Sequence, residues 1–256
     1  MAALDIHQIP VWDDNYVYLA HDPETGSTAV VDPADAEPVL AAAKAKEWNI
    51  THILNTHHHP DHVGGNLEIK QATGCTIVGA RSDAGRIPGI DVQVSDGDSY
   101  EMGSATAKVF DVPGHTSGHI AYWFADSDAL FCGDTLFALG CGRLFEGTAE
   151  QMWRSLGKLR TLPASTRVYC VHEYTQANAR FAVTVDPKNA ALAARSAEID
   201  RLRAEGRPTV PSTIAEELAT NPFLRADDDG VAAAVGMAGA DPVAVFAEVR
   251  GRKDRF

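Results

Sequence analysis

Short apolar runs separated by turn residues alternate with amphipathic stretches in the first part of the chain. The runs at residues 4–11, 16–20 and 28–31 predict strands of a meander. The Ala-, Lys- and Glu-rich stretch at 35–48 predicts a helix, because its small and long-chain residues favour helical geometry. The same alternation then continues, with strands expected at 51–56 and 75–80 and a helix expected at 63–73, ended by Gly74.

In the second part of the chain, the amino-acid composition and the pattern of apolar residues change near residue 174. Before that point we expect further strands at 105–112, 119–124, 129–132 and 167–171 and a helix at 150–162. Beyond it the chain is rich in Ala, Arg and Glu and carries no further strand signal, and the helices expected there lie at 176–183, 187–205, 214–218 and 242–249. Mixed strands and helices predict an α/β (α+β) fold of stacked sheets with helices on their outer faces. We therefore predict two domains, residues 1–174 and residues 175–256.

Composition and charge narrow the class of protein. Hydrophobic residues make up 45% of the chain and charged residues 22%, which is typical of globular proteins. A net charge of −13 argues against nucleic acid as a partner, because nucleic-acid-binding proteins usually carry a basic face. Asp5 and His7 interrupt the stretch where a signal peptide would need apolar residues, and no apolar run is long enough for a membrane span. We expect a cytoplasmic monomer that binds no membrane.

The cysteines Cys75, Cys132, Cys141 and Cys170 are widely spaced and form no CxxC pair. Such spacing is typical of a reducing compartment, so we expect free thiols. Cys132 and Cys170 lie in apolar runs, which predicts buried, inert side chains.

The segment THHHPDH, residues 56–62, has the highest density of possible metal-binding side chains in the chain. In an extended segment alternate side chains share a face, so His57 and His59 can offer two nitrogen ligands to one metal ion. Beyond the proline the chain turns, and Asp61 and His62 can offer an oxygen and a nitrogen to a second ion.

Three later residues complete a candidate ligand set: His115 in PGHTSGH, Asp134 in FCGDTLF and His172 in VHEYT. Five histidines and two aspartates are too many for one tetrahedral ion, but they suit two ions that share a carboxylate, for which Asp134 is the natural bridge. The ligand types favour zinc, with iron or manganese as alternatives. We expect His58 to be structural or exposed, whereas His119 either hydrogen-bonds the site or packs beside it.

The pattern THxHxDH followed by a spaced His, Asp and His resembles the metallo-β-lactamase superfamily over about the first two-thirds of the chain. The resemblance implies an αββα sandwich. The segments THHHPDHVGGN, VPGHTSGHI, FCGDTLFALGCGRLFEGT and VHEYT are similar to the glyoxalase II, or hydroxyacylglutathione hydrolase, family. With the helical C-terminal domain, this resemblance covers nearly the whole chain.

The resemblance to glyoxalase II assigns roles by matched motif. It implies that His57, His59 and His115 hold one metal ion, that Asp61, His62 and His172 hold the other, and that Asp134 bridges them, with Asp61 and Asp134 as the catalytic carboxylates. It also implies a glutathione site formed by Arg143, Phe145, Tyr174, Arg250 and Lys253. Some family members have a Tyr in place of Phe145 and a Lys in place of Arg143, so hydrogen bonding there differs while the charge is kept.

The implied activity is hydrolysis of the thioester of S-(2-hydroxyacyl)glutathione, with S-D-lactoylglutathione as the substrate and glutathione and D-lactate as products. A hydroxide generated by the two metal ions would be the nucleophile, and the reaction is the second step of methylglyoxal detoxification. The alternative from the same fold is a glutathione persulfide dioxygenase with one iron. A binding or scaffold protein that kept its ligands and lost turnover is a second alternative, from a different class.

Overall fold

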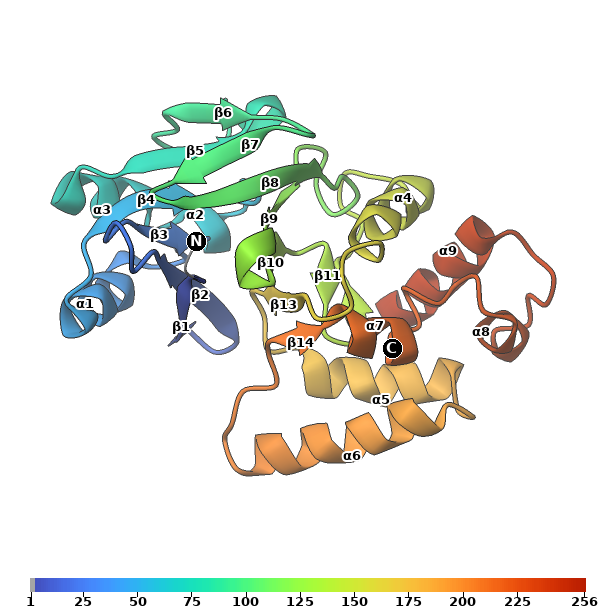
Figure 1. The fold of residues 1–256 in the computed structure, drawn as a ribbon. Helices are drawn as coiled ribbons and strands as arrows, with labels where there is room; N and C mark the ends of the chain where they lie inside the picture. The colour runs from blue at the N-terminus through green and yellow to red at the C-terminus, as the bar shows by residue number, and fades with distance from the viewer. Residues whose placement is uncertain (1–2) are drawn as a thin grey trace. The chain divides into compact units, whose positions relative to one another are not determined.

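The computed structural model describes residues 3–256 (Figure 1). The chain divides into two compact units. The first unit takes in the chain up to Asp111 together with Ser117–Gly133, and the second consists of Val112–Thr116 and Asp134–Phe256. The predicted division into residues 1–174 and 175–256 is a different description of the chain and stays a prediction.

A six-stranded sheet forms the centre of the first unit, in the order β1-β2-β3-β4-β5-β6. The first three strands are antiparallel, and β3 to β6 are parallel because crossover segments connect them. The strands are β1 (Asp5–Val11), β2 (Asn15–His21), β3 (Thr28–Val31), β4 (Ile50–Leu54), β5 (Thr76–Ala80) and β6 (Val92–Val94).

Helices α1 (Ala36–Lys46) and α3 (Asn66–Thr73) lie in the crossovers and cover one face of this sheet. Val39 and Ile69 join the sheet residue Ile53 in one buried apolar cluster. The helix predicted at 63–73 is wrong in its start, because the structure has the short α2 (Pro60–Val63) and then a break before α3. The chain turns at Gly64, where a Cβ atom would lie 2.5 Å from the carbonyl oxygen of Ala34.

Four antiparallel strands of a second sheet also belong to the first unit, in the order β10-β9-β8-β7. They pack against the first sheet, since the Tyr122 hydroxyl donates to the Asn55 carbonyl at 3.1 Å and the Tyr18 and Phe131 rings lie 5.7 Å apart. The elements of this part are β7 (Ser99–Met102), β8 (Ala105–Asp111), β9 (Ile120–Phe124) and β10 (Ala129–Gly133), with the 3-10 helices η1 (Arg81–Asp83) and η2 (Ala125–Ser127).

The second unit consists mainly of helices. Its core joins α5 and α6 through Ala182, Leu192 and Ile199, and rings of Phe181 and Phe223 stack 6.0 Å apart beside them. The elements are β11 (Leu136–Phe137), β12 (Gly140–Cys141), α4 (Ala149–Leu159), β13 (Arg167–Cys170), α5 (Thr175–Val185), α6 (Ala190–Ala204), β14 (Ser212–Thr213), α7 (Ile214–Thr220), α8 (Asp229–Ala234) and α9 (Pro242–Asp254).

The expectation that no strand follows residue 175 is wrong. Strand β14 pairs with β13 in antiparallel register, with Arg167 opposite Thr213. A strand of two residues is too short to produce the alternation of apolar and polar residues on which the prediction depends. Strands β11 and β12 also have two residues each and were not predicted for the same reason. The six-residue α8 was not predicted either.

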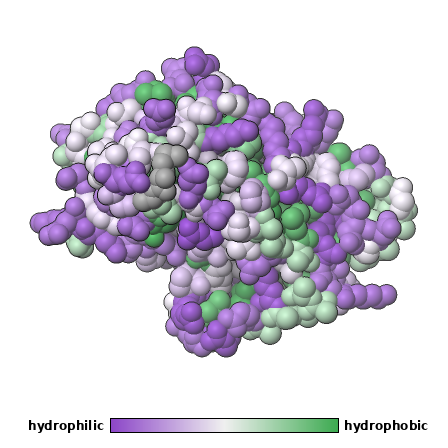
Figure 2. All heavy atoms as spheres, in the orientation of Figure 1, coloured by the Kyte–Doolittle hydropathy of each residue, from purple (hydrophilic) through white to green (hydrophobic). Residues whose placement is uncertain are grey.

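Hydrophilic residues cover most of the face drawn in Figure 2, with hydrophobic residues among them in small groups. All four cysteines are free thiols, as predicted, and burial is found for Cys75 and Cys141 as well as for the expected Cys132 and Cys170. Among the residues that the structure describes, no helix combines the length and the apolar composition needed to cross a membrane.

Candidate metal centre and substrate pocket

The histidines of segment 57–62 gather where β4 ends and α2 begins in the first unit. Pro60 occupies the first turn of α2, where its missing N–H costs nothing, and the turn brings His62 back beside His57. The ring centroids of His57 and His62 lie 4.0 Å apart, and those of His57 and His59 lie 4.6 Å apart. Asp61 is next to them, with its Oδ2 atom 3.6 Å from Nε2 of His62. Four of the predicted ligands therefore lie together.

The buried carboxylate of Asp32 fixes two of these imidazoles. Its Oδ2 atom accepts from Nδ1 of His62 at 3.0 Å and from the Thr56 hydroxyl at 2.6 Å. The same hydroxyl oxygen lies 3.2 Å from Nδ1 of His57 and can accept a hydrogen bond from it. A histidine that donates through Nδ1 keeps Nε2 as the nitrogen that can bind a metal, so Asp32 selects the tautomer that a ligand needs.

The two other histidines near this segment have different roles. Nδ1 of His58 lies 2.9 Å from Oδ2 of the buried Asp83, away from the ligand group. The His119 ring stacks on that of His57, with centroids 4.5 Å apart and planes at 18°, while its Nδ1 faces the carbonyl of Ile120 at 3.0 Å. The structure thus shows His119 packed on a predicted ligand, and a hydrogen bond from His119 to the site stays a prediction.

The remaining three predicted ligands lie together in the second unit, and all three are buried. The two carboxylate oxygens of Asp134 face different histidines, with Oδ2 at 3.3 Å from Nε2 of His115 and Oδ1 at 3.5 Å from Nε2 of His172. Nδ1 of His115 lies 2.8 Å from the Arg143 carbonyl oxygen and can donate to it, which again leaves Nε2 for a metal. Asp134 thus lies between two imidazoles, with one at each of its carboxylate oxygens.

A cavity of about 710 Å³ opens beside Asp134 in the second unit. It brings together all five residues expected to contact glutathione and two of the predicted metal ligands. Its walls also include residues that the sequence analysis did not single out for the pocket. The lining residues are His115, Asp134, Phe137, Cys141, Arg143, Phe145, Tyr174, Ala177, Asn178, Arg180, Arg250, Lys253 and Phe256.

Two aromatic residues of the cavity contact the histidines beside Asp134. Tyr174 stacks on His172, with ring centroids 4.6 Å apart and planes at 4°. Phe145, whose side chain is largely exposed, meets His115 edge-on at 5.2 Å. Each of these histidines thus carries an apolar ring that extends into the pocket.

Four cations line the same cavity. Burial and the neighbouring Arg250, Arg143 and Arg180 lower the pKa of Lys253 to about 8. Arg250 is buried and donates to the Cys141 carbonyl at 2.8 Å, and it pairs with Asp254 at 3.0 Å. The cavity is therefore a local positive region in an acidic protein, which suits an anionic ligand.

Residues 10–172 match the metallo-beta-lactamase superfamily, and residues 173–256 match the family described as hydroxyacylglutathione hydrolase C-terminus. The hydroxyacylglutathione hydrolase of Methylococcus capsulatus is 65% identical over 253 residues, which cover 99% of this chain and 99% of that protein. The chain belongs to the hydroxyacylglutathione hydrolase family.

Two solved structures are also similar to this family member. ETHE1 from Myxococcus xanthus is 28% identical with a TM-score of 0.69, and the match covers 96% of this chain and 90% of that one. TTHA1623 in a di-iron-bound form is 26% identical with a TM-score of 0.56, covering 66% of this chain and 91% of that one. The predicted metallo-β-lactamase fold with a helical C-terminal region is confirmed. That fold and the clustered His and Asp side chains indicate that this family member binds divalent metal.

Sequence reasoning missed several residues of this family member, among them Asp32, Asn178 and Arg180. Asp32 lies 30 positions from His62, and nothing local connects them. Asn178 and Arg180 lie on α5 with Ala177, and the spacing of Ala177 and Arg180 places them on one face of the helix. A predicted helix directly after the Tyr174 motif was therefore the one signal that could have found Arg180.

Proposed function

We propose that the protein hydrolyses the thioester of S-(2-hydroxyacyl)glutathione, with S-D-lactoylglutathione as substrate and glutathione and D-lactate as products. The observation that carries the proposal is the cavity in which His115 and Asp134 lie beside four cationic side chains. The name of the 65% identical relative supports the same reaction.

We propose two zinc ions as the cofactors, with iron or manganese as alternatives. One ion would be held by His57, His59 and His115, and the other by Asp61, His62 and His172. Asp134 would bind both ions. The donor set fits, because imidazole and carboxylate suit these metals and the Nδ1 atoms of His57, His62 and His115 face acceptors inside the protein. The solved structure with two irons supports a dinuclear site.

When bound, the two ions would supply a water that ionises near neutral pH and a Lewis acid for the thioester carbonyl. The protein's own residues hold the metal ions and the thioester in position. Asp61 and Asp134 act as ligand carboxylates, and Tyr174 and Phe145 form apolar walls beside the histidines. A thioester held against these walls would lose little further freedom in the reaction, which lowers the entropic part of the barrier.

Recognition of glutathione falls to the cations of the cavity. Glutathione has two carboxylates, and Arg143, Arg180 and Lys253 offer charges to them. Arg250 is buried and engaged by Cys141 and Asp254, so it contributes chiefly by shaping the wall and by its charge. Phe145 offers no hydroxyl, and the peptide would meet an apolar ring there.

The deciding experiment follows thioester loss and free thiol with S-D-lactoylglutathione, before and after chelation and again after zinc is restored. We expect activity to disappear with the metal and return with zinc. The variant Asp134→Ala should lose metal and activity together. A rate that a chelator leaves unchanged would contradict the proposal.

The dioxygenase alternative has no specific observation in its favour, and oxygen consumption with glutathione persulfide tests it. A monomeric state and a cytoplasmic location stay predictions from the sequence.

A further inference from the structure

Residues 134–143 form a tight loop, which we call the hairpin loop, built on the paired strands β11 and β12. It begins at the candidate ligand Asp134 and ends at Arg143 of the cavity. Side chains from the helical region hold its backbone at five consecutive residues. Asn221 donates to Phe137 and Gly140, Asn178 to Ala138 and Arg250 to Cys141, and the Leu139 N–H donates to Glu217.

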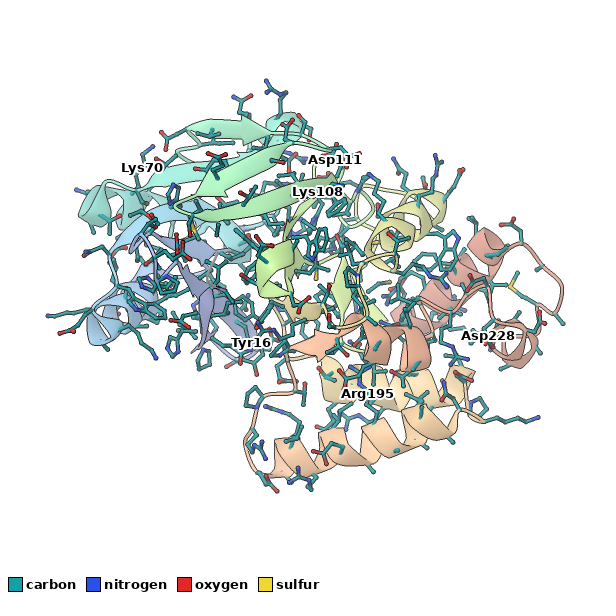
Figure 3. The ribbon with its side chains drawn as sticks, in the orientation of Figure 1. Tyr16, Lys70, Lys108, Asp111, Arg195 and Asp228 are labelled. Atoms are coloured by element: carbon teal, nitrogen blue, oxygen red, sulfur yellow. The ribbon has the colours of Figure 1, made fainter. Side chains whose placement is uncertain are left out.

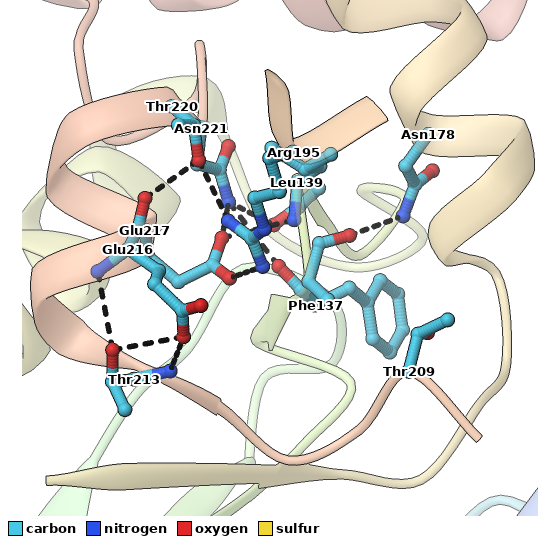
Figure 4. Close-up of polar contacts among 12 residues, drawn as sticks. Phe137, Leu139, Asn178, Arg195, Thr209, Thr213, Glu216, Glu217, Thr220 and Asn221 are labelled. Atoms are coloured by element: carbon cyan, nitrogen blue, oxygen red, sulfur yellow. Dashed lines mark hydrogen bonds and ion pairs between the residues drawn. The ribbon is translucent and has the colours of Figure 1, made fainter. Parts of the chain in front are cut away.

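Glu217 is the central residue of this arrangement (Figure 4). Its side chain is 0% exposed. One carboxylate oxygen accepts from the Leu139 N–H and from Asn221, each at 2.9 Å, and the other accepts from Arg195 at 2.5 Å. Arg195 lies on α6 (Figure 3), so a second helix, distant in sequence from the hairpin loop, completes the network.

The loop needs this support because Leu139 adopts a left-handed backbone with φ of 57°. A branched side chain rarely adopts that conformation, which persists only where the surroundings enforce it. A buried carboxylate is itself costly unless it is paired and hydrogen-bonded. The charge of Arg195 satisfies Glu217, and Glu217 in turn holds the Leu139 N–H.

The hairpin loop is in close contact with the candidate ligands. A Cβ atom on Gly142 would lie 2.0 Å from the backbone oxygen of Asp134, so the returning strand passes directly over that residue. The Arg143 carbonyl oxygen lies 2.8 Å from Nδ1 of His115. A shift of the loop would therefore move Asp134 and release the ring of His115.

We propose that Glu217 is a positioning residue that sets the places of Asp134 and His115 by fixing the hairpin loop. The helical region then serves the metal centre as well as substrate recognition. This inference rests on the proposed function, because it assumes that Asp134 and His115 are metal ligands.

The test compares Glu217→Ala and Glu217→Gln with the control Glu216→Ala. Glu216 is the neighbouring residue on α7, is exposed, and completes a capping box with Thr213 without touching the hairpin loop. Each metal-free protein is titrated with Co²⁺, whose absorption reports the coordination, and with Zn²⁺ against a competing chelator. Thermal unfolding, kcat and KM are measured on the same samples.

We expect both alanine variants to unfold at lower temperature. Only Glu217→Ala should change the Co²⁺ spectrum and lose about tenfold or more in zinc affinity and in kcat, with a smaller effect on KM. Glu217→Gln keeps an oxygen for the Leu139 N–H and should show an intermediate loss. If Glu217→Ala does not fold, the comparison of Glu217→Gln with Glu216→Ala decides whether Glu217 positions the ligands.

The inference is overturned if the folded Glu217 variants match Glu216→Ala in spectrum, zinc affinity and kcat. A wild-type protein that binds the metals but leaves the thioester intact would instead overturn the proposed function. In that case the metal titrations would still decide the role of Glu217.

Discussion

The carboxylate of Asp32 accepts a hydrogen bond from Nδ1 of His62 at 3.0 Å, and both side chains are fully buried. Through the Thr56 hydroxyl the same carboxylate also reaches His57. One residue outside the histidine motif thus orients two of its imidazoles. The metal affinity of the motif should therefore depend on Asp32.

We expect Asp32→Ala to lower zinc affinity and kcat by about 10- to 100-fold, because the rings of His57 and His62 lose the partner that fixes their orientation. Zinc competition with a chelator and steady-state kinetics measure the two effects. The matched control is Asp35→Ala, which removes the cap of α1 and costs about 1 kcal/mol of stability without touching the histidines. Equal zinc affinity in the two variants would contradict this role for Asp32.

A methyl group on Gly142 should disturb Asp134 directly. The added Cβ atom would lie 2.0 Å from the Asp134 carbonyl oxygen and 3.0 Å from Nδ1 of His115, so the backbone must shift. We expect Gly142→Ala to lose metal and activity together, as measured by metal content after dialysis and by kcat.

The control for Gly142 is Gly157→Ala in helix α4, where a Cβ atom meets nothing within 4 Å. That change should raise stability by up to about 1 kcal/mol, since alanine favours the helix more than glycine does. A Gly142→Ala protein with full metal content would show that the loop is more pliable than these distances indicate.

The sequence was most informative where the chemistry is local. His57, His59 and His62 lie within six positions, so their approach needed only a turn at Pro60. Asp32 and Glu217 could not be found in this way, because each acts on a residue many positions away, and a lone carboxylate in a sequence carries no sign of burial. The fold was predicted at the level of strands that alternate with helices.

The details that escaped prediction depend on close backbone contacts and on very short elements. At the break between α2 and α3 the Gly65 N–H donates to the Pro33 carbonyl and Gly64 lies against the Ala34 carbonyl, and local sequence shows neither contact. The hairpin loop depends on side chains from three helices that follow it in the chain, including Asn178 and Arg250. Long-range contacts of this kind override local propensity.

The cation Arg180 gives a third prediction. It is exposed and lines the cavity, and we expect Arg180→Ala to raise KM for the anionic thioester several-fold while kcat and metal content stay unchanged. The control Arg154→Ala removes an exposed arginine that pairs with Glu150 at 2.6 Å, outside the cavity. A change in KM of the same size in both variants would assign the effect to net charge.

The fourth prediction concerns pH and Lys253. Burial first, and then the charges of Arg250, Arg143 and Arg180, lower the pKa of Lys253 from its usual 10.5 to about 8. Only the ammonium form attracts a carboxylate, so KM should rise as the pH increases through 8, whereas kcat at saturating substrate should change less because a bound anion favours the protonated form. The free energy of unfolding should also rise over this range, so the protein becomes more stable while its affinity for the substrate falls. The unfolded chain keeps this proton up to about pH 10.5, so the contribution of Lys253 to stability becomes more favourable between pH 8 and 10.5.

The variant Lys253→Arg separates this titration from that of the substrate, since a guanidinium stays charged over the whole range. We expect its KM to be nearly constant from about pH 7 to pH 9, where the wild-type KM rises. Steady-state kinetics corrected for spontaneous thioester hydrolysis give both profiles. Parallel profiles for the two proteins would place the ionisation on glutathione, and Lys253 would then have no part in the pH dependence of binding.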